Sequence, residues 1–157
     1  MCSSDLAGTL ASSVSMSGGT LDADETSTVS GALSQSGNIT IDVADTKTLT
    51  YSGTALNLGA NTLTLIGGGT LSNTNALVLN HANSLLSLAG ILVIGDVDGT
   101  TASNPAGTKG IKVTSSATLG DYDLSAVSYL DIAANKTLAG QLNLQSNGEL
   151  NISGLGR

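Results

Sequence analysis

Apolar and polar residues alternate in short segments along nearly the whole chain. Between Asn38 and Gly95, alternating pieces such as ITIDV, TLTLI and LLSL recur every six to eight residues, separated by Gly, Asn, Ala, Ser or Asp. Side chains that alternate with a period of two point to opposite faces of a β-strand. The pattern therefore predicts many short strands, each with one apolar face and one polar face.

Equivalent pieces also recur at a longer period, which predicts stacked coils of strand. We take the strongest alternating pair in each coil as a marker, which gives Val14/Met16, Ile39/Ile41, Leu63/Leu65, Leu86/Leu88, Ile111/Val113, Leu130/Ile132 and Leu150/Ile152. The markers are 19–25 residues apart, with two further strand positions between them, and such a period is typical of a solenoid. We expect an all-β fold: a single-stranded, right-handed parallel β-helix (β-solenoid) of about six coils, with three short strands per coil.

Two other folds fit the pattern less well. A helix requires an apolar spacing near 3.6, and Gly and β-branched residues interrupt every window of this chain. An antiparallel sandwich also uses many short strands, but it needs hairpin turns between them. Asp98-Gly99 and Asn147-Gly148 are the only Asp-Gly or Asn-Gly pairs, so the repeat favours the solenoid.

Three asparagines recur with the coils. Asn38, Asn61 and Asn83 lie 23 and 22 residues apart, each just before a marker strand. Stacked at one corner, their side chains could form an amide ladder, each bonded to the copies above and below. The alternative is three separate turn residues, since Asn tolerates the left-handed conformation of many turns.

The N-terminal residues differ in origin from the repeat. Residues 1–6, MCSSDL, resemble the translation of a sequencing-library adapter end, so we expect a non-native leader at 1–6 and a solenoid fragment at 7–157. The leader holds the only cysteine, Cys2, for which a lipoprotein anchor or a surface thiol is the alternative. Without Cys2 the chain has no thiol for a disulfide framework.

Residues 96–110 break the rhythm of the coils. They contain the only proline, Pro105, and no inward-facing aliphatic residue after Val97. We expect an excursion loop between two coils, and loops on a rigid scaffold often carry binding residues. The candidate contact residues in this loop are Asp96, Asp98, Asn104 and Lys109.

Composition and charge exclude two classes of partner. Only 11 % of the residues are charged, the net charge is −7, and the five basic residues are scattered along the chain. Without a basic stripe, we expect no nucleic-acid partner. The longest nearly apolar run, Leu85–Gly95, is too short to span a bilayer, so we also expect no membrane insertion by this segment.

Pairs of acidic residues are the main candidates for chemistry. They are Asp22/Asp24, Asp96/Asp98 and Asp121/Asp123, and a spacing of two puts both carboxylates on one face. Such pairs could bind Ca²⁺ or act as an acid and a base, but none is followed by the remaining ligands of an EF-hand loop. We interpret them, and the single histidine, His81, as solvated turn residues, and expect no catalytic, cofactor or metal site.

The repeat resembles that of a known class of surface proteins. GANTLTLIGGGTLSNTNAL at Gly59–Leu77 and SGGTL at Ser17–Leu21 resemble the degenerate strand repeats of bacterial autotransporter passengers and filamentous-haemagglutinin-like adhesins. The resemblance implies a secreted or surface-displayed bacterial protein, held at the outer membrane by parts outside this chain. Since the alternation runs to both ends without a polar cap, we also expect neighbouring coils of the same parent chain at both ends.

The resemblance implies a function without catalysis. We expect a structural or binding segment of an adhesin-type protein whose partners are glycans or matrix proteins on a host or neighbouring-cell surface. The alternative is a β-helix domain of a carbohydrate-active or phage-tail protein that binds or cleaves polysaccharide.

Overall fold

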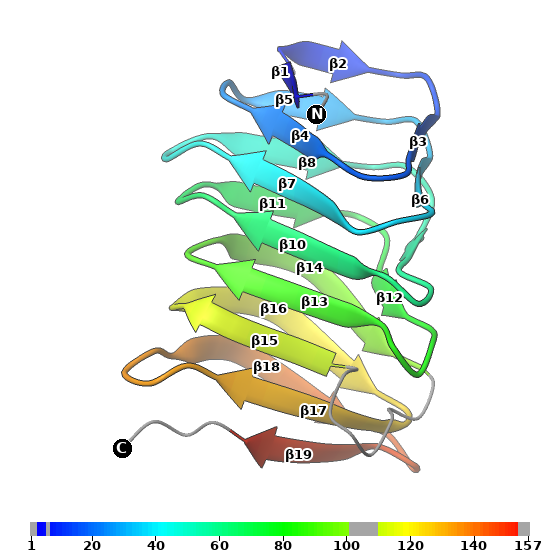
Figure 1. The fold of residues 1–157 in the computed structure, drawn as a ribbon, viewed down its shortest axis with the longest axis vertical. Coiled ribbons are helices and arrows are strands. Elements are labelled where there is room, and N and C mark those ends of the chain that lie inside the picture. The colour runs from blue at the N-terminus through cyan, green and yellow to red at the C-terminus, as the bar shows by residue number, and fades with distance from the viewer. Residues whose placement is uncertain (1–2, 6, 101–109, 154–157) are drawn as a thin grey trace.

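The chain winds into a stack of β-strand coils, as the computed structural model in Figure 1 shows for residues 3–5, 7–100 and 110–153. These residues form nineteen strands and no helix, so none of them belongs to a helix that could cross a bilayer. Strand pairing is parallel and joins each strand to its equivalent in the next coil. The predicted all-β parallel β-solenoid of about six coils is confirmed.

The strands line up in two long sheets and one short pair (Figure 1). The first sheet contains, in spatial order, β1 (Ser3–Asp5), β4 (Thr20–Ala23), β7 (Ile39–Val43), β10 (Thr62–Ile66), β13 (Leu85–Ala89), β15 (Gly110–Ser115), β17 (Val127–Ile132) and β19 (Glu149–Ser153). The second contains β2 (Gly8–Leu10), β5 (Ser27–Val29), β8 (Thr48–Tyr51), β11 (Thr70–Asn73), β14 (Leu92–Gly99), β16 (Ala117–Leu124) and β18 (Leu138–Leu144). In addition, β12 (Leu77–Leu79) pairs with β14, and β9 (Leu56–Asn57) pairs with β12. The short pair is β3 (Val14–Met16) with β6 (Leu33–Gln35).

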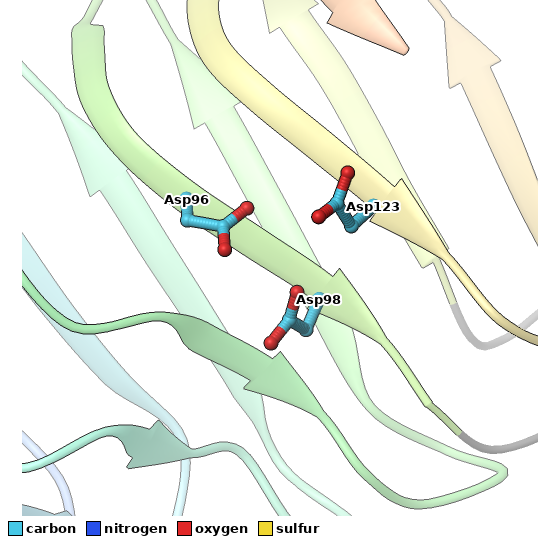
Figure 2. A group of neighbouring side chains, drawn as sticks. All are labelled: Asp96, Asp98 and Asp123. Carbon is cyan, nitrogen blue, oxygen red and sulfur yellow. The ribbon is translucent and has the colours of Figure 1, made fainter. Parts of the chain in front are cut away.

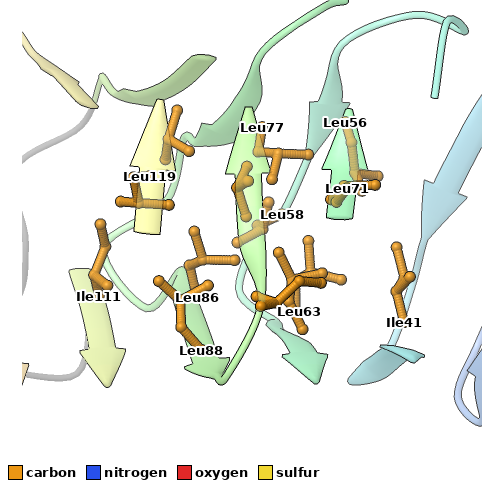
Figure 3. Packing of buried hydrophobic residues seen from close by; sticks show 14 of the residues in the cluster. Ile41, Leu56, Leu58, Leu63, Leu71, Leu77, Leu86, Leu88, Ile111 and Leu119 are labelled. Atoms are coloured by element: carbon orange, nitrogen blue, oxygen red, sulfur yellow. The ribbon is translucent and has the colours of Figure 1, made fainter. Parts of the chain in front are cut away.

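Aliphatic side chains fill the narrow space between the sheets. Along β10, Leu63 and Leu65 are fully buried while the residues between and beside them are only partly buried. Leu63 is in register with Leu86 of the next coil (Figure 3). Leu65 is likewise in register with Leu88, so leucine stacks on leucine along the axis. Each fully buried Leu contributes roughly 1.5–3 kcal/mol, which explains how a chain without Phe or Trp builds a core.

Strand register confirms the middle of the predicted alignment and corrects its ends. The five markers from Ile39/Ile41 to Leu130/Ile132 stack on one another in the first sheet. The first marker was wrong, because Ile41 pairs with Leu21 of β4 while Val14 and Met16 belong to the short pair. The last was shifted by two residues, because Leu130 pairs with Ile152. A period of two makes such a shift invisible in the sequence.

Only in the first part of the stack does each coil contain three separate strands. From β14 onward, the second and third strand positions of a coil join into one strand of seven or eight residues. The pairing of β14 with β16 still shifts register between Val93 and Asp96, and a similar shift occurs between β16 and β18. The joined strands therefore turn the corner of the coil at an irregularity rather than at a turn.

Strand β14 extends into the region that was predicted as an excursion loop. Asp96–Gly99 is the end of β14, and Gly110 begins β15, so both ends of the predicted loop belong to the sheets. Val97 is buried and pairs with Tyr122, which explains why the strand continues past Asp96. Asn104 and Lys109 lie outside the described residues. Within the leader, residues 3–5 form β1, which pairs with β4.

Two of the asparagines before the marker strands, Asn38 and Asn61, bond backbone groups through their side chains. Asn38 accepts a hydrogen bond of 2.8 Å at its side-chain oxygen from the Thr62 amide in the next coil. The Asn61 side chain donates to the Leu58 carbonyl of its own turn at 3.0 Å, and the backbone N–H of Asn83 donates to His81 Nδ1 at 3.1 Å. For Asn38 and Asn61 these bonds correct the predicted ladder, because coils are joined by an amide-to-backbone bond instead. His81 is exposed in a turn, as predicted.

Candidate functional site: an acidic face

Four aspartates of two neighbouring coils form one acidic face. Asp96 and Asp98 lie on β14, and Asp121 and Asp123 lie on β16. The register pairs Asp96 with Asp121 and Asp98 with Asp123. The residues between them, Val97 and Tyr122, are buried, so alternation along both strands turns the four carboxylates outward.

A buried asparagine holds the strand where the acidic face begins. Asn73 ends β11 and donates from its side-chain nitrogen to the Asp96 carbonyl at 3.0 Å and to the Asn75 carbonyl at 3.1 Å. The chain passes so close to Asn73 that a Cβ on Gly95 would lie 2.1 Å from the Asn73 carbonyl oxygen. Glycine at position 95 is thus a requirement of packing, and the Asn73 contacts set where β14 bends.

The carboxylates of the acidic face are close together. Oxygens of Asp96, Asp98 and Asp123 all lie within 4.8 Å of one another, and Figure 2 shows the three groups converging from the two strands. All three side chains are half-buried. Like charges directly opposite on neighbouring strands destabilise a sheet, so this grouping has an energetic cost in the folded chain.

Burial, together with the same repulsion, raises the pKa of Asp96 and of Asp98 on β14. Burial raises the pKa of Asp96 above its usual 3.8, and the charges of Asp123 and Asp121 raise it further, against a hydrogen bond from the Val97 backbone that lowers it. Burial also raises the pKa of Asp98, followed by the charges of Asp96 and Asp123. Both groups therefore hold protons more tightly than an exposed aspartate does.

Side-chain amides extend the face onto the next coil. Gln141 and Asn143 of β18 are in register with Asp121 and Asp123. The Gln141 amide donates to the Asn143 side-chain oxygen at 3.1 Å, and the Asn143 amide donates to Asp123 at 2.7 Å. A hydrogen-bonded chain thus runs from β18 to the aspartates and leaves an outward surface dominated by acceptor oxygens.

The geometry is compatible with two kinds of chemistry. Carboxylate oxygens 2.3–2.6 Å from one Ca²⁺ ion lie within roughly 5 Å of one another, and Asp96, Asp98 and Asp123 meet that condition. Two carboxyls about 5 Å apart, one with a raised pKa, also resemble the acid and base of a glycoside hydrolase. Acceptor-rich surfaces of carboxylates and amides further suit sugar hydroxyls and cationic groups.

Of the three predicted acidic pairs, Asp96/Asp98 and Asp121/Asp123 lie next to each other on the acidic face. Asp96/Asp98 and Asp121/Asp123 lie in strands, so their interpretation as turn residues was wrong. Asp22 lies in β4, opposite Asp42, and Asp24 is exposed just after that strand. Of the predicted contact residues, the structure places Asp96 and Asp98 on the acidic face.

A signal for this face was present in the sequence. Asp121 follows Asp96 by one coil of 25 residues, and Asp123 follows Asp98 by the same distance. Two Asp-x-Asp pairs one period apart predict neighbours in a solenoid. The signal was missed because residues 96–110 were assigned to a loop, which removed one pair from the stack.

Fold and site together define the class of the protein: a β-solenoid repeat protein that carries an acidic, amide-extended face on β14, β16 and β18. Comparisons with protein-family models, with curated proteins and with solved structures gave no match for this chain.

Proposed function

We propose that the chain is a binding and structural segment of a secreted or surface-displayed bacterial adhesin-type protein. The observation that carries this function is the acidic face, where four carboxylates and two amides stand in register on three adjacent strands. A stack with a continuous aliphatic core is a stiff support, because each coil is fixed by its neighbours. Such a support presents a surface at a fixed geometry and needs no moving parts.

The charge of the face selects its partner. A surface of carboxylates repels uronic-acid and sulfated glycans and attracts amine-bearing ones. We therefore assign it to amino-bearing or neutral glycans, or to basic segments of matrix proteins, on a host or neighbouring cell. Side-chain amides such as Gln141 and Asn143 add donors and acceptors for hydroxyl groups at one edge.

A binding assay with a matched pair of variants tests this function. Immobilised chain is exposed to an amine-bearing, a neutral and an acidic polysaccharide, and binding is followed by interferometry. The double variant D96N/D98N should lose binding to the amine-bearing polymer, whereas D22N/D24N, which removes the same charge in another coil, should retain it. Equal binding by both variants, or a preference for the acidic polymer, would contradict the assignment.

A second function has support from the pKa of one residue. Asp96 holds a proton more tightly than usual and lies within 4.8 Å of Asp98 and Asp123, as a general acid beside a carboxylate does. The chain would then be a domain of a carbohydrate-active or phage-tail protein that cleaves polysaccharide. Release of reducing ends or unsaturated products, abolished in D96N and retained in D24N, would establish this function in place of the first.

A further inference from the structure

Hydroxyl-bearing side chains form a regular grid on the outer face of three neighbouring coils. The strands β5, β8 and β11 are adjacent in the second sheet (Figure 1). Buried residues alternate along them with exposed or partly buried Thr and Ser residues, so these hydroxyl groups point outward. The hydroxyl grid consists of Thr26, which directly precedes β5, and of Thr28, Thr48, Thr50, Thr70 and Ser72.

Strand register aligns the hydroxyl grid in two columns that run along the stack. Thr28 pairs with Thr50 in one column, which the serine of β11 continues. Thr48 pairs with Thr70 in the other column, and the Thr48 backbone N–H donates to the Thr26 hydroxyl oxygen at 3.3 Å. The pairing of β14 with β16 shifts register, whereas the pairings of β5 with β8 and of β8 with β11 do not. Both columns therefore stay straight over three coils.

The geometry of parallel strands sets the spacing of the hydroxyl grid. Neighbouring coils lie about 4.7–4.9 Å apart, and two residues along a parallel strand span about 6.6 Å. Threonine is branched at Cβ, so few rotamers are open to its hydroxyl and methyl groups. Beneath the grid, Leu49 and Leu71 are buried and in register, which holds the strands in place. The face thus presents hydroxyl and methyl groups at fixed positions on a two-dimensional lattice.

The hydroxyl groups are available to a ligand, and the face around them is uncharged. Within the described residues, no hydrogen bond engages the side-chain hydroxyl groups of Thr28, Thr48, Thr50, Thr70 and Ser72. Residues 26–30, 48–52 and 70–74 contain no charged side chain, although the whole chain has a net charge of −7. Beside the grid, Glu25 and Lys47 neutralise each other in an ion pair of 2.6 Å. Each open hydroxyl group can donate one hydrogen bond and accept two.

The outer face of the first sheet differs in charge. Thr40, Thr64 and Ser87 also lie in register there and form a single column of hydroxyl groups. The column beside it contains Asp22 opposite Asp42. A ligand that approaches this face therefore meets carboxylates, whereas the hydroxyl grid offers two uncharged columns side by side.

An uncharged lattice of hydroxyl groups is complementary to the surface of ice. Water molecules on the prism face of ice repeat at closely similar distances in two perpendicular directions, and they offer donors and acceptors without net charge. Water held between protein hydroxyl groups bonds nearly as well as a direct contact does. A protein partner would instead need the aromatic and apolar anchors that the grid lacks. We propose that the hydroxyl grid binds ice. The proposal does not depend on the proposed function.

Ice-affinity partition tests this binding. Ice is grown slowly from a dilute solution of the full chain, which should become enriched in the ice and should shape the growing crystals into facets. T50K places a long charged side chain within the grid and should lose the enrichment, and T28K on the neighbouring strand should lose it independently. T64K makes the same substitution at a partly buried, outward threonine of the first sheet and should retain the enrichment.

Three results would overturn ice binding by the grid: exclusion of the full chain from ice, enrichment retained by both T50K and T28K, and equal loss in T64K. Binding to suspended chitin or cellulose without enrichment in ice would also overturn it, in favour of a polysaccharide ligand. The circular dichroism spectrum of each variant should match that of the full chain, and if one grid variant unfolds, the other decides. D96N/D98N should retain the enrichment, so the outcome here is separate from that for the acidic face.

Discussion

Neutralising Asp98 should stabilise the protein, and the acidic face determines by how much. Asp98 lies within 4.8 Å of carboxylate oxygens of both Asp96 and Asp123. Two unit charges at that distance repel by about 1 kcal/mol in water and by about 3.5 kcal/mol at an effective dielectric constant of 20. Because Asp98 is half-buried and the solvent screens part of the field, D98N should stabilise the fold by about 1–2 kcal/mol at pH 7.

The raised pKa of Asp98 determines how the stabilisation by D98N should change with pH. Since the pKa of Asp98 is raised in the folded chain, folding binds protons, and stability is greatest below the unfolded value near 3.8. That stability is lost as the pH rises through the folded pKa. D98N cannot ionise, so its advantage over the natural chain should be full at pH 7 and should disappear as the pH falls toward 3.8.

Urea unfolding followed by far-ultraviolet circular dichroism measures the effect. With a slope of about 2 kcal/mol per molar, D98N should raise the midpoint by roughly 0.5–1 M at pH 7. EDTA keeps divalent cations off the carboxylates, and added salt should shrink the gain. D24N, at an exposed position after β4, is the control and should change the midpoint little. A gain in D24N equal to that in D98N, or a D98N gain that persists at pH 4, would refute the electrostatic reasoning.

Three further predictions concern the core. Leu65 is fully buried in the middle of the stack, so L65A should lower the free energy of unfolding by about 2–5 kcal/mol in the same urea assay. Gln35 has a buried side-chain oxygen without a hydrogen-bond partner, and the carbonyl that its amide bonds also accepts from Asn61, so Q35M should raise stability by about 1–3 kcal/mol. Burial raises the pKa of Tyr122 to about 12, against a 2.6 Å hydrogen bond with Ser128 that lowers it. Tyr122 should therefore still be protonated at pH 11, which absorbance at the phenolate band measures, and stability should fall as the pH rises from 10 toward 12.

Much of the scaffold could be predicted because it depends on local alternation. Alternation with a period of two identifies the pairs Leu63/Leu65 and Leu86/Leu88 as inward-facing. The spacing between the coils then predicts that the two pairs stack on each other. The ends were predicted less well, because Val14/Met16 alternates as strongly as Leu21 and Ala23 do, yet lies in another sheet. Alternation identifies a strand but does not say on which side of the coil it falls.

The candidate site was predicted only in part, because the end of strand β14 was placed too early in the sequence. Asp96 and Asp98 were recognised as a pair, but residues 98–110 contain no Val, Leu or Ile, and this absence indicates a loop. In the structure, Val97 is held by Tyr122 and the strand is held by Asn73, and both contacts come from other coils. No window of sequence around Asp96 contains that information.

The sequence by itself thus determined that the chain forms strands, which side chains face inward, and that coils of about twenty residues stack in parallel. These properties follow from side-chain polarity with a period of two and from the repeat. Only the tertiary structure decided the register between coils of unequal length, and with it which outward residues become neighbours. Because register converts positions 25 residues apart into direct partners, the acidic face exists only in the folded stack.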